Sequence, residues 1–171
     1  EVFSTSTLHG ETKSEDREEW RSLREGHVVL IDTPGIDELD GAEREALARR
    51  ISNRADVTLM LCEGDLSHPE FQALEQLCAA RRTVLLILNK SDRYSQDELR
   101  LLLDRLRERC RHLLSPERII PASSDPRPET LIYVDSSGKE REKSRPVPPD
   151  IALLKETLWS ILEKEGHTLS A

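Results

Sequence analysis

Short apolar runs that alternate with longer helical patterns are the feature that most constrains the fold of this chain. Four such runs occur, each followed by polar or turn-forming residues, at 27–31, 56–62, 83–89 and 118–122. Apolar positions recur at helical spacing in the stretches 41–53, 69–80, 95–114 and 151–163. Strands that alternate with helices predict a parallel sheet covered on both faces, so the fold class is α/β.

Two segments break this alternation. Residues 18–24 precede the first apolar run, and we expect an edge strand there, antiparallel to that run, with Trp20 as its apolar anchor. Residues 125–150 contain the run Thr130–Val134, a Ser-Ser-Gly turn and a polar stretch, which together predict a surface hairpin inserted before the last helix. A length of 171 residues suits one domain, so we expect a single domain over 1–171 that carries this insert.

The bulk composition excludes some classes of partner. A formal net charge of −8 argues against nucleic acid, because binding to its backbone depends on Lys and Arg. Apolar runs approaching the roughly 18 to 20 residues of a membrane helix do not occur, so we expect no membrane contact within this segment. The three cysteines are far apart in the sequence, which fits a reducing cytosol and a cytoplasmic location.

The first polar motif at a strand end is Asp32-Thr-Pro-Gly35. In an open parallel sheet the ligand lies beyond the carboxyl ends of the strands. An Asp at such an end can hold Mg²⁺, and a Gly lets a backbone N–H approach a terminal phosphate. Asp and Gly are also ordinary turn residues, so this motif alone does not distinguish a phosphate site from a turn.

The second motif, Asn89-Lys90-Ser-Asp92, directly follows the third apolar run. The carboxylate of Asp92 can accept from both the ring N–H and the exocyclic amino group of guanine, a pair that adenine cannot offer. We expect Asn89 to tie the loop together and reach the base, and the aliphatic stem of Lys90 to lie over the ring. A helix-capping turn is the alternative interpretation. The spacing from Asp32, which two strands and two helices just fill, favours the nucleotide site.

These motifs resemble those of the translation-factor-like GTPases, the Era and tRNA-modification group in particular. The sequence Ile-Pro-Ala-Ser123-Ser124 is similar to the family's Ser-Ala loop, with Ser124 where Ala is usual. Since the family uses a backbone N–H there to touch the guanine oxygen, the change should matter little. Gly10-Glu-Thr12 looks like switch I, and the resemblance implies that Thr12 completes the Mg²⁺ shell and senses the terminal phosphate; Thr7 is the alternative.

The resemblance implies a P-loop NTPase fold of the Ras-like type: a three-layer sandwich with a mostly parallel sheet and one antiparallel edge strand. No Gly-x-x-x-x-Gly-Lys-Ser/Thr motif occurs in the 171 residues. That loop supplies the backbone N–H cradle for the phosphates, and its strand belongs in the middle of the family's sheet. We therefore expect the first strand and the phosphate loop to lie outside this sequence, and these residues alone to bind nucleotide weakly and to be inactive.

The residue after Gly35 is Ile36, where Ras-like proteins have the glutamine that orients the attacking water. Isoleucine neither donates nor accepts a hydrogen bond, so the water has to be positioned by switch I backbone, a monovalent cation or a partner. Slow intrinsic hydrolysis, stimulated by a homodimer or an activating protein, is the expected consequence.

A GTP- and GDP-binding switch that hydrolyses GTP is therefore the function we expect of the complete protein. The alternative is a non-catalytic GTPase-like interaction module that uses the hairpin or the switch surface to hold a partner. The start of the chain, the hairpin and the ending Gly166-His-Thr-Leu169 also look like bacterial Era-like GTPases that continue into a membrane-associated C-terminal region. That resemblance implies membrane association through regions outside this segment.

Overall fold

The structure, a computed structural model, describes residues 16–19, 29–33, 42, 43, 46, 55–80, 83–134 and 140–169. The chain forms two compact units, one of residues 1–60, 66–85 and 157–171 and the other of residues 61–65 and 86–156. The boundary between the units passes through two strands and one helix that are continuous in the chain. Each unit is described by itself below.

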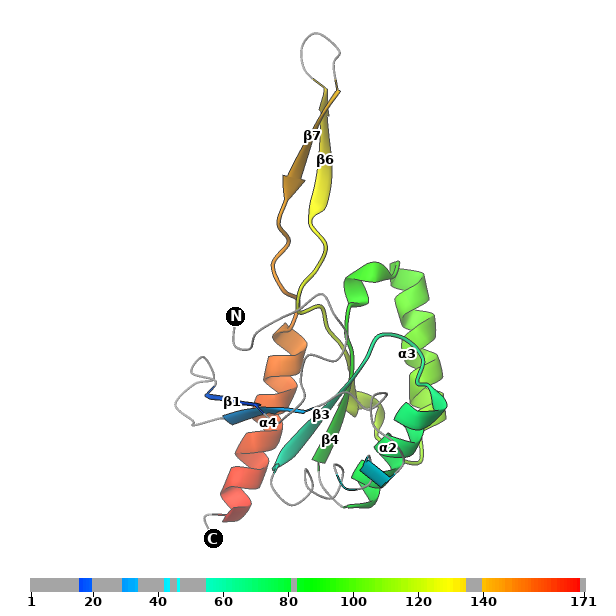
Figure 1. The fold of residues 1–171 in the computed structure, drawn as a ribbon, viewed down its shortest axis with the longest axis vertical. Coiled ribbons are helices and arrows are strands. Elements are labelled where there is room, and N and C mark those ends of the chain that lie inside the picture. Colours follow the sequence, from blue (N-terminus) through cyan, green and yellow to red (C-terminus); the bar gives the residue numbers. More distant parts are fainter. Residues whose placement is uncertain are drawn as a thin grey trace. The chain divides into compact units, whose positions relative to one another are not determined.

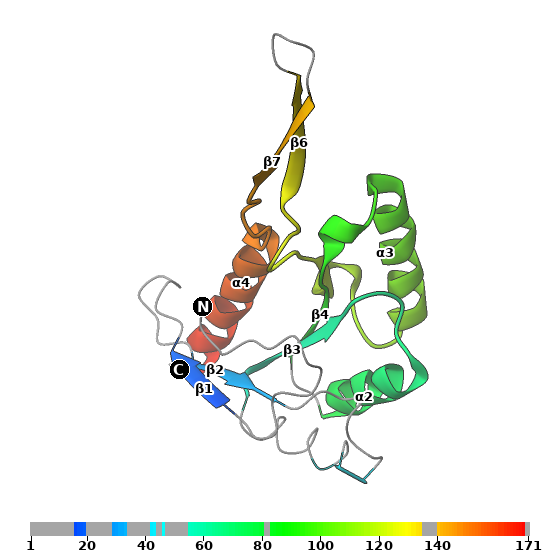
Figure 2. The same cartoon turned by 45° about the horizontal axis from the view of Figure 1, so that its top comes forward.

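The first unit contains an antiparallel pair of short strands, β1 (Asp16–Glu19) and β2 (Val29–Asp32), which Figure 2 shows side by side. Their register places Asp16 opposite Asp32 and Glu19 opposite Val29. The predicted antiparallel partner of the first apolar run is thus present, and β1 overlaps the predicted range 18–24, of which residues 20–24 lie outside the described residues. Trp20, its expected anchor, lies outside the described residues.

A parallel sheet of three strands follows in the order β3 (Val57–Cys62), β4 (Thr83–Leu88) and β5 (Ile119–Pro121). Figure 1 shows β3 and β4 next to each other. β4, the middle strand, is buried from Val84 to Leu88, as the continuous apolar run predicts for a strand with neighbours on both sides. The sheet confirms the α/β class, and the fold is that of a P-loop NTPase.

The helices begin where sequence signals place them. α2 (His68–Ala79) starts after Ser67, and α3 (Gln96–Cys110) after Ser95, each through a capping box with the Glu three residues on. In α3 the Ser95 N–H and hydroxyl both donate to Glu98, at 2.9 and 2.8 Å, and hold the pKa of that carboxyl below its ordinary value.

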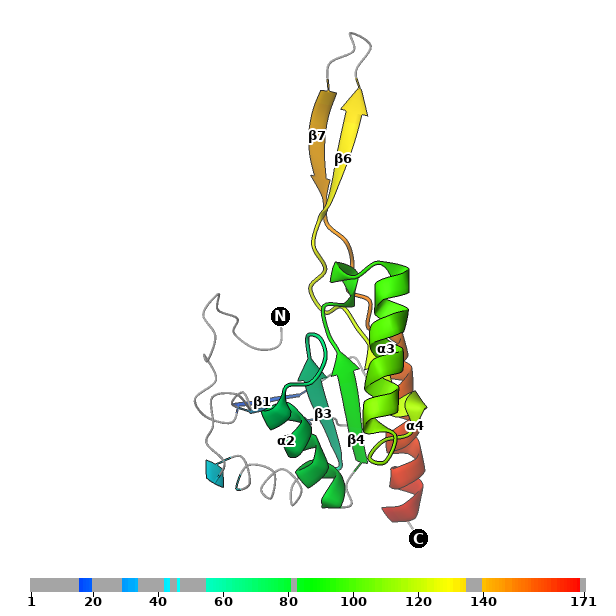
Figure 3. The same ribbon diagram turned by 90° about the vertical axis from the view of Figure 1, so that its right-hand side faces the viewer.

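α3 buries one stripe, formed by Leu103, Leu106 and Cys110, and packs against β5. Figure 3 shows it running along β4, the neighbour of β5 in the sheet. α4 (Ala152–Leu169) extends beyond the predicted end at 163. Among the described helices, none combines the length and the apolar character needed to cross a membrane.

The segment 125–150 contains the antiparallel strands β6 (Glu129–Val134) and β7 (Glu140–Arg145), visible as a two-stranded ladder in Figure 1. Glu129 lies opposite Arg145 and Val134 opposite Glu140. Most of the predicted helix 41–53 lies outside the described residues, and the three positions described there, 42, 43 and 46, are helical.

Candidate functional site

The carboxyl ends of β4 and β5 meet at one edge of the sheet, within the second unit. Leu88 pairs with Pro121, and the Ala122 N–H donates to the Leu88 carbonyl at 2.9 Å. One residue further on, the Asn89 N–H donates to the Cys62 carbonyl of β3 at 2.8 Å. The Asn89 loop is therefore fixed by backbone bonds to both neighbouring strands.

Asp92 lies in η2 (Ser91–Arg93), a single helical turn directly beyond β4. The Ser123 hydroxyl donates to one oxygen of the Asp92 carboxylate at 2.5 Å, and the Arg127 N–H donates to the other at 3.2 Å. The Ser123 bond is the main reason that the pKa of Asp92 lies below its ordinary value, with the Arg127 N–H adding to it against the opposing effect of burial. The carboxylate is thus held ionised and oriented.

Ser123 is itself locked in place, with only 2% of its surface exposed. Its N–H donates to the Asp150 carbonyl at 2.9 Å, and the Asp150 N–H donates back to the Ser123 carbonyl at 2.8 Å. These two bonds tie the start and the end of the 125–150 segment together beside the Asp92 carboxylate.

Asn89 joins the two loops from the other side. Its side-chain oxygen accepts from the Ser124 N–H at 3.4 Å and from the Ser124 hydroxyl at 3.3 Å. The loop-tying contact expected of Asn89 is therefore present, and it leaves the Asn89 amide nitrogen as the group able to reach a ligand. Asn89 and Asp92 each hold a different residue of the β5 loop.

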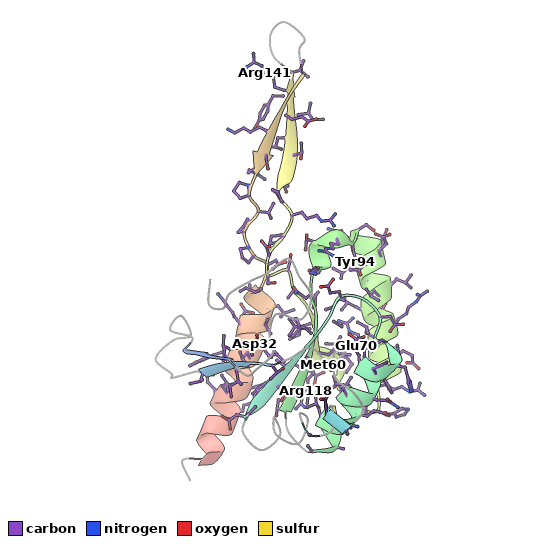
Figure 4. All side chains as sticks on the ribbon, in the orientation of Figure 1. Asp32, Met60, Glu70, Tyr94, Arg118 and Arg141 are labelled. Carbon is purple, nitrogen blue, oxygen red and sulfur yellow. The ribbon has the colours of Figure 1, made fainter. Side chains whose placement is uncertain are left out.

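Lys90 has a φ of 56°, in the left-handed region, the one such non-glycine residue in the part of the chain that the structure describes. Its ammonium group pairs with the Glu63 carboxylate, to which Arg93 also comes within 3.6 Å. The hydroxyl of Tyr94, labelled in Figure 4, donates to the Glu63 carbonyl at 2.6 Å. The end of β3 thus positions the Lys90 side chain and its loop.

Three residues that take part in these contacts were not singled out in the sequence: Glu63, Tyr94 and Arg127. Glu63 is the first polar residue after a buried strand, so its place in the sequence offered a signal comparable to that of Asp32. Arg127 contributes only its backbone N–H, a group that every residue except proline carries, so its identity gave no signal.

The proposed phosphate-side residues are divided between described and undescribed parts of the chain. Asp32 is half-buried at the carboxyl end of β2, in the first unit, and Figure 4 labels it. Thr12 and Gly35 lie outside the described residues, as does Ile36. Of the phosphate-side residues, the structure thus describes only Asp32. The residues that the structure brings together are those expected to contact the base: Asn89, Lys90, Asp92, Ser123 and Ser124.

The observed bonding leaves room for the ligands that the motifs imply. A carboxylate offers about four lone-pair sites, and Ser123 and Arg127 take one on each oxygen of Asp92, so acceptor capacity remains for the N–H groups of a base. Mg²⁺ at nucleotide sites is held by one or two carboxylates together with the phosphates and water, so a single strand-end Asp such as Asp32 suits it. Groups of three or more metal-ligating side chains are absent from the described residues.

The parallel sheet and the polar loops at its carboxyl ends, together with the family match that follows, make the chain a P-loop NTPase domain. Residues 1–90 match the family described as 50S ribosome-binding GTPase, and the chain belongs to that family. It is accordingly a small GTPase domain of a GTP-binding protein. The matched range includes Thr12, Asp32, Gly35, Asn89 and Lys90. Comparison with curated proteins and with solved structures gave no match.

Proposed function

We propose that this chain is the GTPase domain of a molecular switch that binds GTP and hydrolyses it to GDP. The observation that carries the proposal is the Asp92 carboxylate, held by Ser123 and Arg127 at the carboxyl ends of two adjacent parallel strands. A buried hydroxyl that orients an exposed carboxylate prepares an acceptor for a ligand. A helix-capping turn does not need that contact.

The base-side roles follow from these contacts. Asp92 accepts the ring N–H and the amino group of guanine and so selects it over adenine. Asn89 holds the Ser124 loop through a long bond from the Ser124 N–H, and guanine takes over that donor with its ring oxygen when it binds. Lys90 lays its aliphatic stem over the ring. Ser123 keeps Asp92 ionised and correctly turned.

The phosphate-side roles rest on the motifs and the family membership. Thr12 and Asp32 hold Mg²⁺, and the Gly35 N–H contacts the terminal phosphate. When bound with the nucleotide, Mg²⁺ neutralises charge on the phosphates. Thr12 and Gly35 are the residues of this chain that sense whether the terminal phosphate is present, and they therefore couple hydrolysis to the switch.

Because Ile36 cannot orient the attacking water, hydrolysis of GTP needs another group to position it. A monovalent cation, a homodimer or an activating protein supplies that function. Within the family we assign the chain to the Era and tRNA-modification group, in a cytoplasmic protein that associates with a membrane through regions outside this segment.

The second candidate function is a non-catalytic interaction module. The β6–β7 hairpin favours it, because both of its strands expose their side chains and no part of it is needed to read a base. Release of phosphate separates the two candidates. A GTPase switch releases phosphate from GTP, faster in potassium than in sodium or at higher protein concentration, whereas the module releases none under any of these conditions.

Titration of a fluorescent GDP analogue onto the full-length protein tests base recognition directly. Asp92→Asn replaces one acceptor by a donor, and we expect the preference for GDP over ADP to fall by roughly 10⁴-fold or more, because a mismatched polar group in the site is left unpaired. Asp125→Asn, an exposed Asp in the next loop, is the matched control and should keep the preference. An Asp92→Asn protein as selective as the wild type would refute the assignment.

A further inference from the structure

Strand β6 is uncharged after its first residue and has an edge with no described strand beside it. After Glu129 it reads Thr-Leu-Ile-Tyr-Val, residue types that favour strands. Ile132, Tyr133 and Val134 are 62%, 51% and 66% exposed. Among the described residues β6 pairs only with β7, so its other edge has backbone N–H and C=O groups with no strand beside them. Proteins usually protect such an edge with charges, proline or a covering segment, because it is a template for another strand.

Strand β7 carries the opposite kind of sequence, Glu-Arg-Glu-Lys-Ser-Arg. Its acidic residues occupy even positions and its basic residues odd positions, so each face of the strand carries charges of one sign. Arg141 is labelled near one end of the ladder in Figure 4. The hairpin therefore has one apolar edge strand and one charged edge strand.

We propose that β6 is a self-association strand, which pairs antiparallel with β6 of a second copy of this chain to form a four-stranded sheet. A two-fold axis perpendicular to a sheet pairs odd positions with odd and even with even. Centred on Ile132, this symmetry pairs Ile132 with Ile132, Leu131 with Tyr133, and Thr130 with Val134. All three pairs join uncharged side chains, and the combinations are favourable across strands.

The same symmetry rule explains why assembly stops at two copies. In any two-fold antiparallel pairing of β7 with β7, odd positions meet odd positions and even meet even. Arg and Lys then face Arg and Lys, and Glu faces Glu or Ser144, which is unfavourable. The sheet formed by two hairpins thus ends in charged outer strands, and the contact closes as an isologous dimer.

The contact is small, so the dimer should be reversible. Stable complexes bury about 800 Å² on each partner, more than five residues on one strand edge can offer. The root of the hairpin is nevertheless tied to the base-side loop through the Ser123 and Asp150 bonds. The inference deepens the proposed function by giving the homodimer a surface, but it does not depend on nucleotide binding.

Ile132→Lys is the decisive variant. Within the hairpin, position 132 lies opposite Glu142, so a lysine there gains an opposite charge and the hairpin is kept. Across the proposed axis, two lysines meet. We expect full-length wild-type protein to show a concentration-dependent monomer–dimer equilibrium by sedimentation, and Ile132→Lys to weaken it at least tenfold. Ser144→Lys adds the same charge to the same face of the hairpin, but on strand β7, and should leave the monomer–dimer equilibrium unchanged.

Cross-linking provides a second readout that does not depend on affinity. Ile132→Cys places two thiols at the axis, where directly opposite strand residues are close enough for a disulfide. Under a mild oxidant this variant should form a covalent dimer, whereas Ser144→Cys and the wild type, with its three natural cysteines, should not.

A wild type that stays monomeric at all concentrations would overturn the inference, as would one that forms larger oligomers or dimerises equally well as Ile132→Lys. All of these measurements are made without nucleotide, so the proposed guanine recognition, tested by Asp92→Asn, stands or fails independently.

Discussion

Strands β4 and β6 have nearly the same kind of sequence and opposite surroundings. β4 reads Thr-Val-Leu-Leu-Ile-Leu and β6 reads Glu-Thr-Leu-Ile-Tyr-Val. β4 is the middle strand of the parallel sheet and is buried along five of its six residues, whereas β6 has one neighbour among the described strands and is exposed along five of its six.

The difference shows that a strand-forming sequence fixes the conformation of a segment but not its burial. In β4 the apolar side chains stabilise the sheet that positions the Asp92 loop. In β6 similar side chains remain available for another surface. An apolar strand that is exposed is therefore more informative about function than one that is buried.

The largest effect is expected when one side chain in each strand is shortened to alanine. Leu86→Ala removes a side chain with no exposed surface and should lower the free energy of unfolding by about 2 to 5 kcal/mol, because it leaves a cavity. Ile132→Ala, made in dilute monomer, should change it by no more than about 0.5 kcal/mol. Urea denaturation measures both. Equal decreases in the free energy of unfolding would mean that β6 is packed in solution even without a partner.

Ser123→Ala should have the next largest effect, since it removes the hydroxyl that orients Asp92. We expect the free energy of unfolding to fall by about 1 kcal/mol at pH 7, and the Asp92 pKa to rise toward its ordinary value. The pKa of Asp92 is lower in the folded than in the unfolded protein. The stabilisation is therefore fully present above the unfolded-state pKa, and it is lost as the pH falls through the folded-state pKa. The difference between wild type and variant should therefore shrink in acid.

Carbon-detected NMR titration of the carboxyl group measures that pKa, and urea denaturation at neutral and acidic pH measures the stability. Ser124→Ala is the contrast, because the Ser124 hydroxyl donates to Asn89, and the hydrogen bonds that lower the Asp92 pKa come from other residues. An Asp92 pKa that shifts equally in both variants would contradict the specific role of Ser123.

A local prediction concerns the start of α3, in the same unit as the Asp92 loop. Ser95→Ala removes the hydroxyl of the capping box and should cost about 1 kcal/mol. Ser160→Ala, at an exposed position inside α4, should be neutral or slightly stabilising. Thermal unfolding followed by circular dichroism compares the two, and a neutral Ser95→Ala would show that packing alone sets this helix end.

The smallest effect is expected at the ion pair of the hairpin. Arg145 donates to Glu129 at 2.6 Å, but both side chains are more than half exposed. Glu129→Gln should therefore lower hairpin stability by only a few tenths of a kcal/mol, and less at high salt, where exposed pairs are screened. Amide hydrogen exchange in β6 at two salt concentrations would detect a larger effect if the pair were important.

Much of this could be predicted from sequence because the signals are local. Buried strands could be recognised as apolar runs, and the helical spacing of apolar residues placed the starts of α2 and α3 within one residue of those observed. The contacts of Glu63 with Lys90 and of Arg127 with Asp92 could not be predicted, because they join segments brought together only by strand order. Strand β1 begins two residues before the predicted start at 18, because polar residues such as Asp16 and Arg17 carry little strand signal.

The paired backbone bonds between Ser123 and Asp150 close the chain at the base of the 125–150 segment. These bonds fix the position of Ser123 relative to Asp150, whichever sequence connects the two residues. Lengthening such a closed loop is inexpensive, at about 0.6 kcal/mol per doubling. Related chains should differ in length beyond Arg127, whose N–H holds Asp92, more than elsewhere, and the β6–β7 hairpin should be replaceable by a short turn or by a foreign domain.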